Sequence, residues 1–304
     1  MSSLGILCPG QGAQHAQMLA LLAAEPAALA VLAQAEAVLG MAPATLAAGP
    51  ELFTNAVAQP LICAAGLATW AALAPKLPPV RVFAGYSVGE LTAWACAGAL
   101  PAATLIRLAS LRAAAMDAAC REPTGLLAVR GLDRRQIEAL CSAHGCAPAI
   151  VNDHDRLVVG GPRAALPGFE AAALALGAQL TPLAVPLASH TPWLAAAVPQ
   201  FAQALAASAP GTPSAPVLAG IDGSAGFSGT DALRTLPAQI AQTVDWAACT
   251  DALVERGCTV LLELGPGSGL SRMARDRHPE LAARSVADFR SLDGAAGWVA
   301  RMLG

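Results

Sequence analysis

The sequence contains little charge for its length. Of its 304 residues 13% are charged, against about 25% in an average soluble domain, and the formal net charge is −3. Lys76 is the only lysine. A chain with so few charges and 55% hydrophobic residues is neither intrinsically disordered nor a charge-laced coiled coil. It also lacks the pool of basic residues that neutralises phosphates, so we expect no nucleic-acid partner.

The sequence also lacks an uninterrupted apolar segment long enough to cross a membrane. Its most apolar stretch, residues 18–48, is broken by Glu25, Pro26 and Glu36, whereas a spanning helix needs about 20 apolar residues in a row. The first residues have neither the basic region nor the apolar core of a signal peptide. We therefore expect a globular, cytoplasmic protein with no membrane partner.

The cysteines form no metal-binding or redox pattern. There are eight, and none are spaced C-x-x-C. The closest pair, Cys141 and Cys146, has no histidines at zinc-finger spacing. We expect these residues to be small buried hydrophobes in a reducing compartment, and we expect no metal site.

Short apolar runs alternate with longer helical stretches, which is typical of an α/β protein. The runs are continuous, as in parallel strands that are covered on both faces. The predicted strands span 4–8, 80–85 and 259–264, and the helical stretches after them begin at Gln14 and span 88–97 and 270–277. Residues 209–230 are rich in proline, glycine and serine, and we expect them to form a surface loop.

Residues 124–189 follow a different pattern, with the order βαββαβ of a ferredoxin-like unit. Asp133 and Gln136 are placed as a capping box for the first helix. The predicted strands are 124–129, 147–152, 156–159 and 179–187, and the predicted helices are 133–144 and 169–176. We predict a small domain at 124–189, inserted in a large α/β domain that consists of 1–123 and 190–304.

The sharpest local signal is Gly85-Tyr86-Ser87-Val88-Gly89, between a predicted strand and a predicted helix. This G-x-S-x-G pattern is typical of the nucleophile elbow of α/β-hydrolase-like folds, where a strained turn holds the serine hydroxyl clear of the sheet. The N–H of Val88 would then be placed to bind a developing oxyanion. An ordinary turn with no catalytic role can carry the same pattern. The predicted strand before it and the predicted helix after it match the setting of a nucleophile elbow and strengthen that prediction.

A serine nucleophile needs a base, and the chain offers five histidines. His144 ends a predicted helix and His154 lies in a tight turn, so we expect both to be solvated. His15 follows the first loop and could line a pocket. His278 lies in a charged run, whereas His190 follows an apolar strand at a domain junction, where clefts form. We favour His190 as the base and keep His278 as the alternative.

Four motifs occur in the order and at the spacing of a known family. They are Gly10-Gln11-Gly12-Ala13-Gln14, Gly85-Tyr86-Ser87-Val88-Gly89-Glu90, Ser189-His190 and Glu263-Leu264-Gly265-Pro266-Gly267. Together they resemble malonyl-CoA:acyl carrier protein transacylases and the acyltransferase domains of polyketide synthases. The resemblance runs from about residue 7 to residue 270, including the inserted small domain.

The resemblance implies a role for particular residues. Ser87 matches the nucleophile that becomes malonylated, and His190 matches its general base. Arg112 matches the arginine that binds the malonyl carboxylate, for which a guanidinium offers two parallel hydrogen bonds. The backbone N–H groups of Gln11 and Val88 match the oxyanion hole.

Two further positions match the family. Gln239 corresponds to the residue whose backbone carbonyl orients the histidine, so the family needs no triad carboxylate. Gln59 and Pro60 match a family pair near the site, and their role stays open.

Two positions depart from the usual pattern of the family. Tyr86, the only tyrosine, replaces a histidine, and Cys8 replaces a phenylalanine. With the Ser189-His190-Thr191-Pro192 segment, these residues look closest to the transacylase (epsilon) subunit of biotin-independent malonate decarboxylase. The acceptor would then be a small acyl carrier protein such as its delta subunit, bearing a phosphoribosyl-dephospho-CoA arm. We expect Tyr86 to flank the pocket without taking part in proton transfer.

The resemblance therefore predicts malonyl transfer from malonyl-CoA, through a malonyl-serine, to a carrier-protein thiol, with no intrinsic cofactor. One alternative is the malonyl-CoA transacylase of fatty-acid synthesis. Another is an α/β-hydrolase esterase or thioesterase with Asp245 or Asp251 and His278 as its acid and base. A third is a non-catalytic subunit of a larger complex.

Carrier proteins are acidic, so exposed arginines are candidates for docking one. Arg272, Arg275 and Arg277 lie close together on a predicted helix. They fit an ordinary solvated helix face as well as a docking surface.

Overall fold

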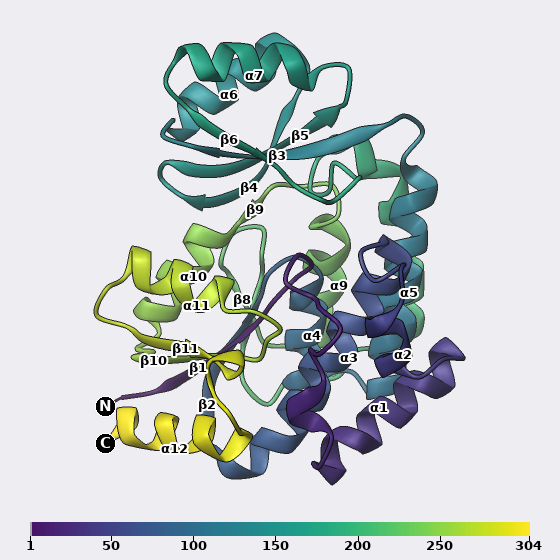
Figure 1. Ribbon diagram of the computed structural model, residues 1–304, viewed down its shortest axis with the longest axis vertical. Coiled ribbons are helices and arrows are strands. Elements are labelled where there is room, and N and C mark those ends of the chain that lie inside the picture. The colour runs from purple at the N-terminus through teal and green to yellow at the C-terminus, as the bar shows by residue number, and fades with distance from the viewer. Residues whose placement is uncertain (1) are drawn as a thin grey trace.

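The computed structural model describes residues 2–304 and contains two sheets, one in each of two stacked parts (Figure 1). The strands of the larger sheet are, in spatial order, β11 (Ala282–Ser285), β10 (Val260–Glu263), β1 (Leu4–Cys8), β2 (Val80–Gly85), β7 (Val217–Leu218) and β8 (Ala225–Gly226). All neighbours are parallel except β7 and β8, which are antiparallel. The predicted α/β class with a parallel central sheet is confirmed.

Helices cover both faces of this sheet. One face packs against α1 (Pro26–Leu39), α3 (Asn55–Leu73), α4 (Val88–Cys96), α5 (Ala102–Ala119), α8 (Val198–Ala207), α9 (Gly229–Ala238) and α12 (Leu292–Leu303), with α2 (Pro43–Ala48) beside α3. The other face packs against α10 (Trp246–Glu255) and α11 (Gly269–Arg277). Along β1, Ile6 belongs to the first core and Leu7 to the second. Burial on both faces explains why β1 is apolar throughout.

The smaller sheet has the ferredoxin-like order. Its strands are β6 (Gln179–Pro182), β3 (Thr124–Arg130), β5 (Arg156–Pro162), β4 (Ala147–Asp153) and β9 (Val244–Asp245), and its helices are α6 (Arg134–His144) and α7 (Leu166–Ala175). The capping box of Asp133 and Gln136 is present at the start of α6. The fifth strand, β9, comes from outside the inserted segment and pairs parallel with β4. This pairing ties the two parts of the chain together through backbone hydrogen bonds.

Three local expectations were wrong. No α-helix begins at Gln14; turns and a short 3-10 helix come first, and α1 starts at Pro26. The last strand of the small sheet ends at Pro182 and not at 187. The Leu183 N–H still donates to the Leu126 carbonyl, but Pro186 has no N–H to offer a ladder. The expected loop at 209–230 contains β7 and β8, which extend the large sheet.

One segment that the sequence analysis missed, Asn55–Lys76, is long and apolar enough to cross a membrane by length and composition alone. Of its most apolar window, 78% is buried inside the protein. The segment, which includes α3, packs against α1, α4 and α5. Its composition is thus explained by its place as the central helix of the core.

Candidate active site

Ser87 occupies a strained turn between β2 and α4. Its φ of 55° and ψ of −123° lie outside the regions that a residue with a side chain ordinarily adopts. The two flanking glycines permit this turn: a Cβ at Gly85 would collide with the backbone of Gly89, and a Cβ at Gly89 would collide with the carbonyl of Cys8. The G-x-S-x-G sequence therefore allows β1, β2 and α4 to approach closely around the serine.

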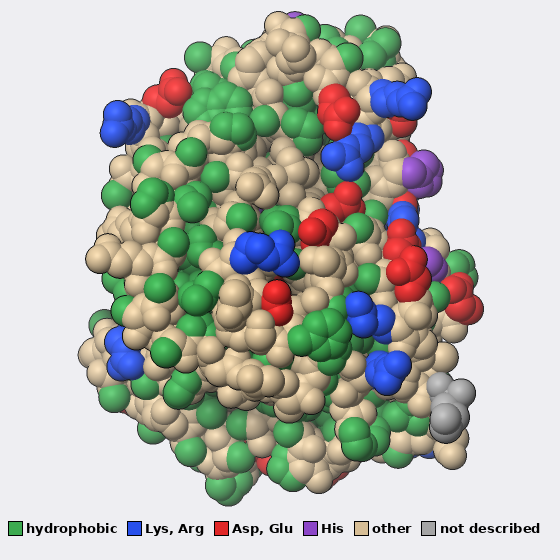
Figure 2. All heavy atoms as spheres, turned by 180° about the vertical axis from the view of Figure 1, so that it is seen from behind, with side chains coloured by type: hydrophobic (Ala, Val, Ile, Leu, Met, Phe, Trp, Pro, Cys, Tyr) green, Lys and Arg blue, Asp and Glu red, His purple; other side chains and the backbone are tan. Residues whose placement is uncertain are grey.

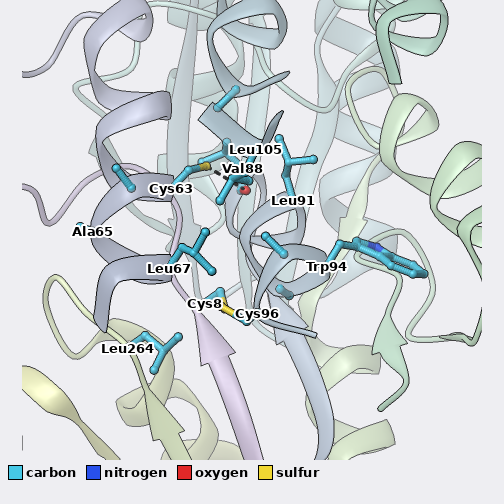
Figure 3. Packing of buried hydrophobic residues seen from close by; sticks show 14 of the residues in the cluster. Cys8, Cys63, Ala65, Leu67, Val88, Leu91, Trp94, Cys96, Leu105 and Leu264 are labelled. Carbon is cyan, nitrogen blue, oxygen red and sulfur yellow. Dashed lines mark hydrogen bonds between the residues drawn. The ribbon is translucent and has the colours of Figure 1, made fainter. Parts of the chain in front are cut away.

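An apolar layer fixes α4 behind this turn. Val88 and Leu91 of α4 pack with Cys63 and Leu67 of α3 (Figure 3). The Cys63 thiol donates to the Val88 carbonyl at 3.9 Å. Full burial of an aliphatic side chain of this size stabilises the folded protein by about 1.5–3 kcal/mol. These contacts hold the start of α4, where the turn presents Ser87, against α3.

His190 contacts Ser87 directly. The Ser87 Oγ and His190 Nε2 atoms are 2.7 Å apart. The other ring nitrogen, Nδ1, donates to the backbone carbonyl of Gln239 at 2.6 Å. A carbonyl only accepts, so the proton lies on Nδ1 and the Nε2 lone pair faces the serine hydroxyl. This is the tautomer that a general base requires.

The backbone of His190 is fixed as firmly as its ring. Its φ is 64°, in the left-handed region, and its N–H donates to the carbonyl of Ile240 at 2.9 Å. Burial, together with the nearby positive charge of Arg112, lowers the pKa of His190 to about 3. The imidazole is therefore neutral at physiological pH.

Two backbone N–H groups beside Ser87 are available as oxyanion donors. In the described part of the chain, the amides of Val88 and Gln11 donate to no protein acceptor. The loop that carries Gln11 lies against the serine turn, because a Cβ at Gly10 would approach the Tyr86 carbonyl to 2.6 Å. The Gln14 side chain accepts the N–H of Gly12 at 2.7 Å and so fixes this loop.

Arg112 is 2% exposed and makes no salt bridge with any residue of 2–304. Its Nη1 donates to Gln59 Oε1 at 2.7 Å, and its Nη2 donates to Gln239 Oε1 at 3.3 Å. Burial lowers the pKa of Arg112 to about 10, so the group stays charged at neutral pH. A buried cation held by amides alone retains the capacity to bind an anion.

Gln59 and Asn55 support this arginine from α3. Gln59 is fully buried, and its Nε2 donates to Asn55 Oδ1 at 2.5 Å. Asn55 donates in turn to the Ala113 carbonyl and to Asp117 Oδ1, both at 3.1 Å. The position of Gln59, whose role the sequence left open, is thus explained: it directs its amide oxygen at Arg112.

Glu90, on the first turn of α4, joins the same network. It is fully buried, and its Oε2 accepts from the Gly220 N–H at 2.8 Å and from Gln239 Nε2 at 2.5 Å. Its Oε1 accepts from the Thr235 hydroxyl at 3.3 Å. Burial raises the pKa of Glu90 to about 7 despite these hydrogen bonds. The sequence analysis gave this residue no role, although a single carboxylate in an otherwise uncharged buried helix is a detectable signal.

Tyr86 points toward the small domain. Its hydroxyl donates to Asn152 Oδ1 on β4 at 3.0 Å, and its ring packs edge-on against Trp246 with 5.4 Å between ring centroids. Burial raises the pKa of the phenol, so it is neutral. This residue connects the two domains next to the serine turn.

A cavity of about 200 Å³ lies where the two domains meet beside the Gln11 loop. It is lined by Gln11, Gly12, Gln14, Phe53 and residues 182–185. The walls are mostly apolar, and Phe53 is exposed there. His15 lines a different cavity, of about 220 Å³, on the far side of the same loop beside Gly265 and Pro266.

The alternative base, His278, does not contact Ser87. Its Nε2 lies 2.7 Å from Asp251 Oδ1 in an ion-pair cluster at the end of α11. Arg277 in the same cluster pairs with Asp251 and with Asp153 of the small domain, both at 2.6 Å. Asp245 caps α10 and pairs with Arg134. The Asp–His combination of an α/β-hydrolase triad is therefore absent from the Ser87 turn.

The three arginines considered for carrier docking differ in their surroundings. Arg277 is paired with two aspartates, and Arg275 donates to the Ala283 carbonyl. Only Arg272 is exposed without such a bond in the described part of the chain. This face of α11 mainly joins the two domains.

Residues 6–288 match the family of acyl transferase domains. The malonyl CoA-acyl carrier protein transacylase of Mycobacterium bovis is 35% identical over 300 residues, covering 96% of this chain and 99% of that protein. The protein of the same name from Haemophilus influenzae is 33% identical over 305 residues, covering 96% and 98%. A malonyl-transacylase solved in complex with a type II PKS acyl-carrier protein has a TM-score of 0.93 at 31% identity, covering 97% of this chain and 99% of its own.

Proposed function

The chain belongs to the acyl transferase family and is an acyltransferase, and we propose that it moves a malonyl group from malonyl-CoA to the thiol of an acyl carrier protein. The observation that carries this proposal is the juxtaposition of a Ser87–His190 pair with Arg112, a buried cation without a salt-bridge partner among residues 2–304. A serine and a base suffice for acyl transfer in general. Arg112 can bind a carboxylate, so it favours an acyl group that carries one, such as malonyl.

In the first half-reaction, Ser87 Oγ attacks the thioester carbonyl carbon while His190 Nε2 takes its proton. The Val88 and Gln11 amides hydrogen-bond the oxyanion, and each donor contributes about 3 kcal/mol to the transition state. The C–S bond then breaks, and the CoA sulfur leaves with the proton from His190. The product is a malonyl-serine ester.

In the second half-reaction, the carrier-protein thiol gives its proton to His190, and its sulfur attacks the ester. Collapse of the tetrahedral intermediate breaks the bond between the malonyl carbonyl carbon and Ser87 Oγ, and His190 returns the proton to Oγ. Arg112 holds the malonyl carboxylate through both halves. Acetyl groups are disfavoured because they would leave this buried guanidinium without an anion.

We propose that the chain is a malonyl-CoA:acyl carrier protein transacylase of fatty-acid or polyketide synthesis. The relatives reported above carry that name or are described with a PKS carrier protein, which supports the alternative drawn from the sequence over the malonate decarboxylase subunit. All groups in the proposed steps come from the chain, so no cofactor is required. The eight cysteines are free thiols, which fits the reducing cytoplasm where we expect the enzyme to work.

Intact-protein mass spectrometry tests the proposal. Incubation with malonyl-CoA should add one malonyl group, located on Ser87 by peptide mapping, and addition of a holo acyl carrier protein should remove it. Two acceptor carrier proteins distinguish fatty-acid or polyketide synthesis from malonate decarboxylation. One bears a phosphopantetheine arm and the other a phosphoribosyl-dephospho-CoA arm. Faster transfer to the second would overturn the fatty-acid or polyketide assignment, and no adduct on Ser87 would overturn the activity.

A further inference from the structure

Gln239 forms hydrogen bonds with both the base and the arginine. Its backbone carbonyl accepts from His190 Nδ1 at 2.6 Å, and its side-chain oxygen accepts from Arg112 Nη2 at 3.3 Å. A primary amide can turn about its last bond and exchange its oxygen and nitrogen. In the exchanged position it would present two N–H donors to the cation. Some acceptor must therefore fix the amide nitrogen on the opposite side.

That acceptor is Glu90. Its Oε2 lies 2.5 Å from Gln239 Nε2, and a carboxylate accepts but does not donate. The same Oε2 also accepts from the Gly220 N–H, so this oxygen acts as an acceptor and holds the Gln239 nitrogen. The oxygen of Gln239 then faces Arg112.

The backbone is shaped to let Glu90 reach this position. Gly220 donates its N–H to the same Oε2 at 2.8 Å, and a Cβ at Gly220 would lie 2.8 Å from that oxygen and 2.9 Å from Gln239 Nε2. A larger residue at 220 would separate the two partners. The carboxylate, the amide and the glycine thus form one close-packed unit behind the arginine.

We propose that Glu90 is a positioning residue for malonyl recognition: by fixing the amide of Gln239, it aims the Arg112 guanidinium at the substrate carboxylate. This inference rests on the proposed function, because it assumes that Arg112 binds the malonyl group. It also separates recognition from acyl transfer, because in the described chain the Glu90 side chain forms no hydrogen bond to Ser87 or His190. Only the backbone N–H of Glu90 reaches the Ser87 carbonyl, at 3.0 Å, and a substitution at position 90 keeps that N–H. Loss of Glu90 should weaken selection of malonyl over acetyl groups while the serine chemistry continues.

Kinetics with malonyl-CoA and acetyl-CoA test this inference. In Glu90→Ala we expect the KM for malonyl-CoA to rise about tenfold, with kcat and the acetyl-CoA parameters within about twofold of wild type. Glu90→Gln should restore malonyl selectivity. Its amide oxygen can accept from Gly220 and Gln239. Its amide nitrogen can donate to the Thr235 oxygen when the single Thr235 hydroxyl proton, which lies within reach of both residue 90 and the Asp231 carbonyl, goes to Asp231.

Glu263 provides a matched control. It is 1% exposed, its pKa is also raised to about 7 by burial, and it accepts from the Ser271 N–H at 2.8 Å at the start of α11. Glu263→Ala should lower the thermal unfolding temperature, as Glu90→Ala should, and leave the malonyl-to-acetyl ratio unchanged. An equal loss of selectivity in both variants would show a general structural effect and overturn the inference.

Two further single variants, Gln239→Ala and Arg112→Ala, keep the result interpretable if Glu90→Ala fails to fold. Gln239→Ala, which keeps the backbone carbonyl, should lose malonyl selectivity by the same factor, and the double variant should lose no more. If Arg112→Ala leaves selectivity intact, the proposed function fails. If Arg112→Ala abolishes selectivity while Gln239→Ala preserves it, only the inference about Glu90 fails.

Discussion

Arg112 and Arg277 show two ways in which this charge-poor chain uses a cation. Arg277 lies at the domain boundary with two aspartates at 2.6 Å, so its charge is already matched. Arg112 is buried, and its two hydrogen-bond partners are neutral amides. Charged side chains gather on the edge near α10 and α11, whereas the rest of the face in Figure 2 is mostly apolar or uncharged. The comparison shows that the charge of the side chains bonded to an arginine, more than its burial, decides whether that arginine remains available to an anionic ligand.

The two histidines of these regions differ in the same way. His278 faces Asp251 in the surface cluster, and His190 faces a serine and a backbone carbonyl. Replacing each histidine with alanine should have different effects on the rate of acyl transfer. His190→Ala should lower kcat for acyl transfer at least ~1000-fold, because the serine loses its base. His278→Ala should retain activity, and steady-state assays that found the reverse would return the base to His278 and favour the esterase alternative.

Replacing Arg112 and Arg277 separately with alanine should distinguish recognition of the malonyl group from the contact between the two domains. Arg112→Ala should lower malonyl transfer about 100-fold, because two charge-assisted hydrogen bonds to the carboxylate are lost, while acetyl transfer holds or rises. Arg277→Ala should change neither rate and should lower the unfolding temperature slightly, less so at high salt. Competition between malonyl-CoA and acetyl-CoA measures the ratio. Equal loss of both substrates in Arg112→Ala would contradict the carboxylate role.

The pH profile should reveal the buried histidine. Because its pKa is lowered from 6.5 to about 3, His190 stays a competent base under mild acid, and the acid limb of kcat/KM should lie well below pH 6.5. Between pH 6.5 and 3 the unfolded chain binds more protons at this position than the folded one, so its contribution to the free energy of unfolding falls as pH falls. His190→Gln should lack that part of the acid sensitivity. An acid limb near pH 6.5 would count against a buried neutral base.

Tyr86→Phe should have the smallest effect of the four. It removes the 3.0 Å hydrogen bond to Asn152 and keeps the ring against Trp246. We expect the free energy of unfolding to fall by about 1 kcal/mol and the rate of acyl transfer to change by less than about threefold. Denaturant titration and the malonyl transfer assay check this. A large loss of rate would show that the hydroxyl takes part in the reaction.

Much of this arrangement can be predicted from local sequence. The glycines around Ser87 specify a strand–turn–helix junction, and Asp133 with Gln136 specifies a helix start, because both depend on neighbouring backbone geometry. The last strand of the small sheet and the loop at 209–230 were misjudged. Whether an apolar or glycine-rich segment pairs with a strand depends on a distant partner, which local pattern does not contain.

Sequence by itself thus determined the two-sheet α/β architecture, the serine turn and the motif set that resembles malonyl transacylases. Tertiary structure alone decided that His190 rather than His278 reaches Ser87. It also decided that Glu90, Arg112 and Gln239 form one unit, although they are far apart in the chain. The physical reason is that hydrogen bonds between buried polar groups act over a few ångströms, and only the packing of α4, α5 and α9 brings these groups within that distance.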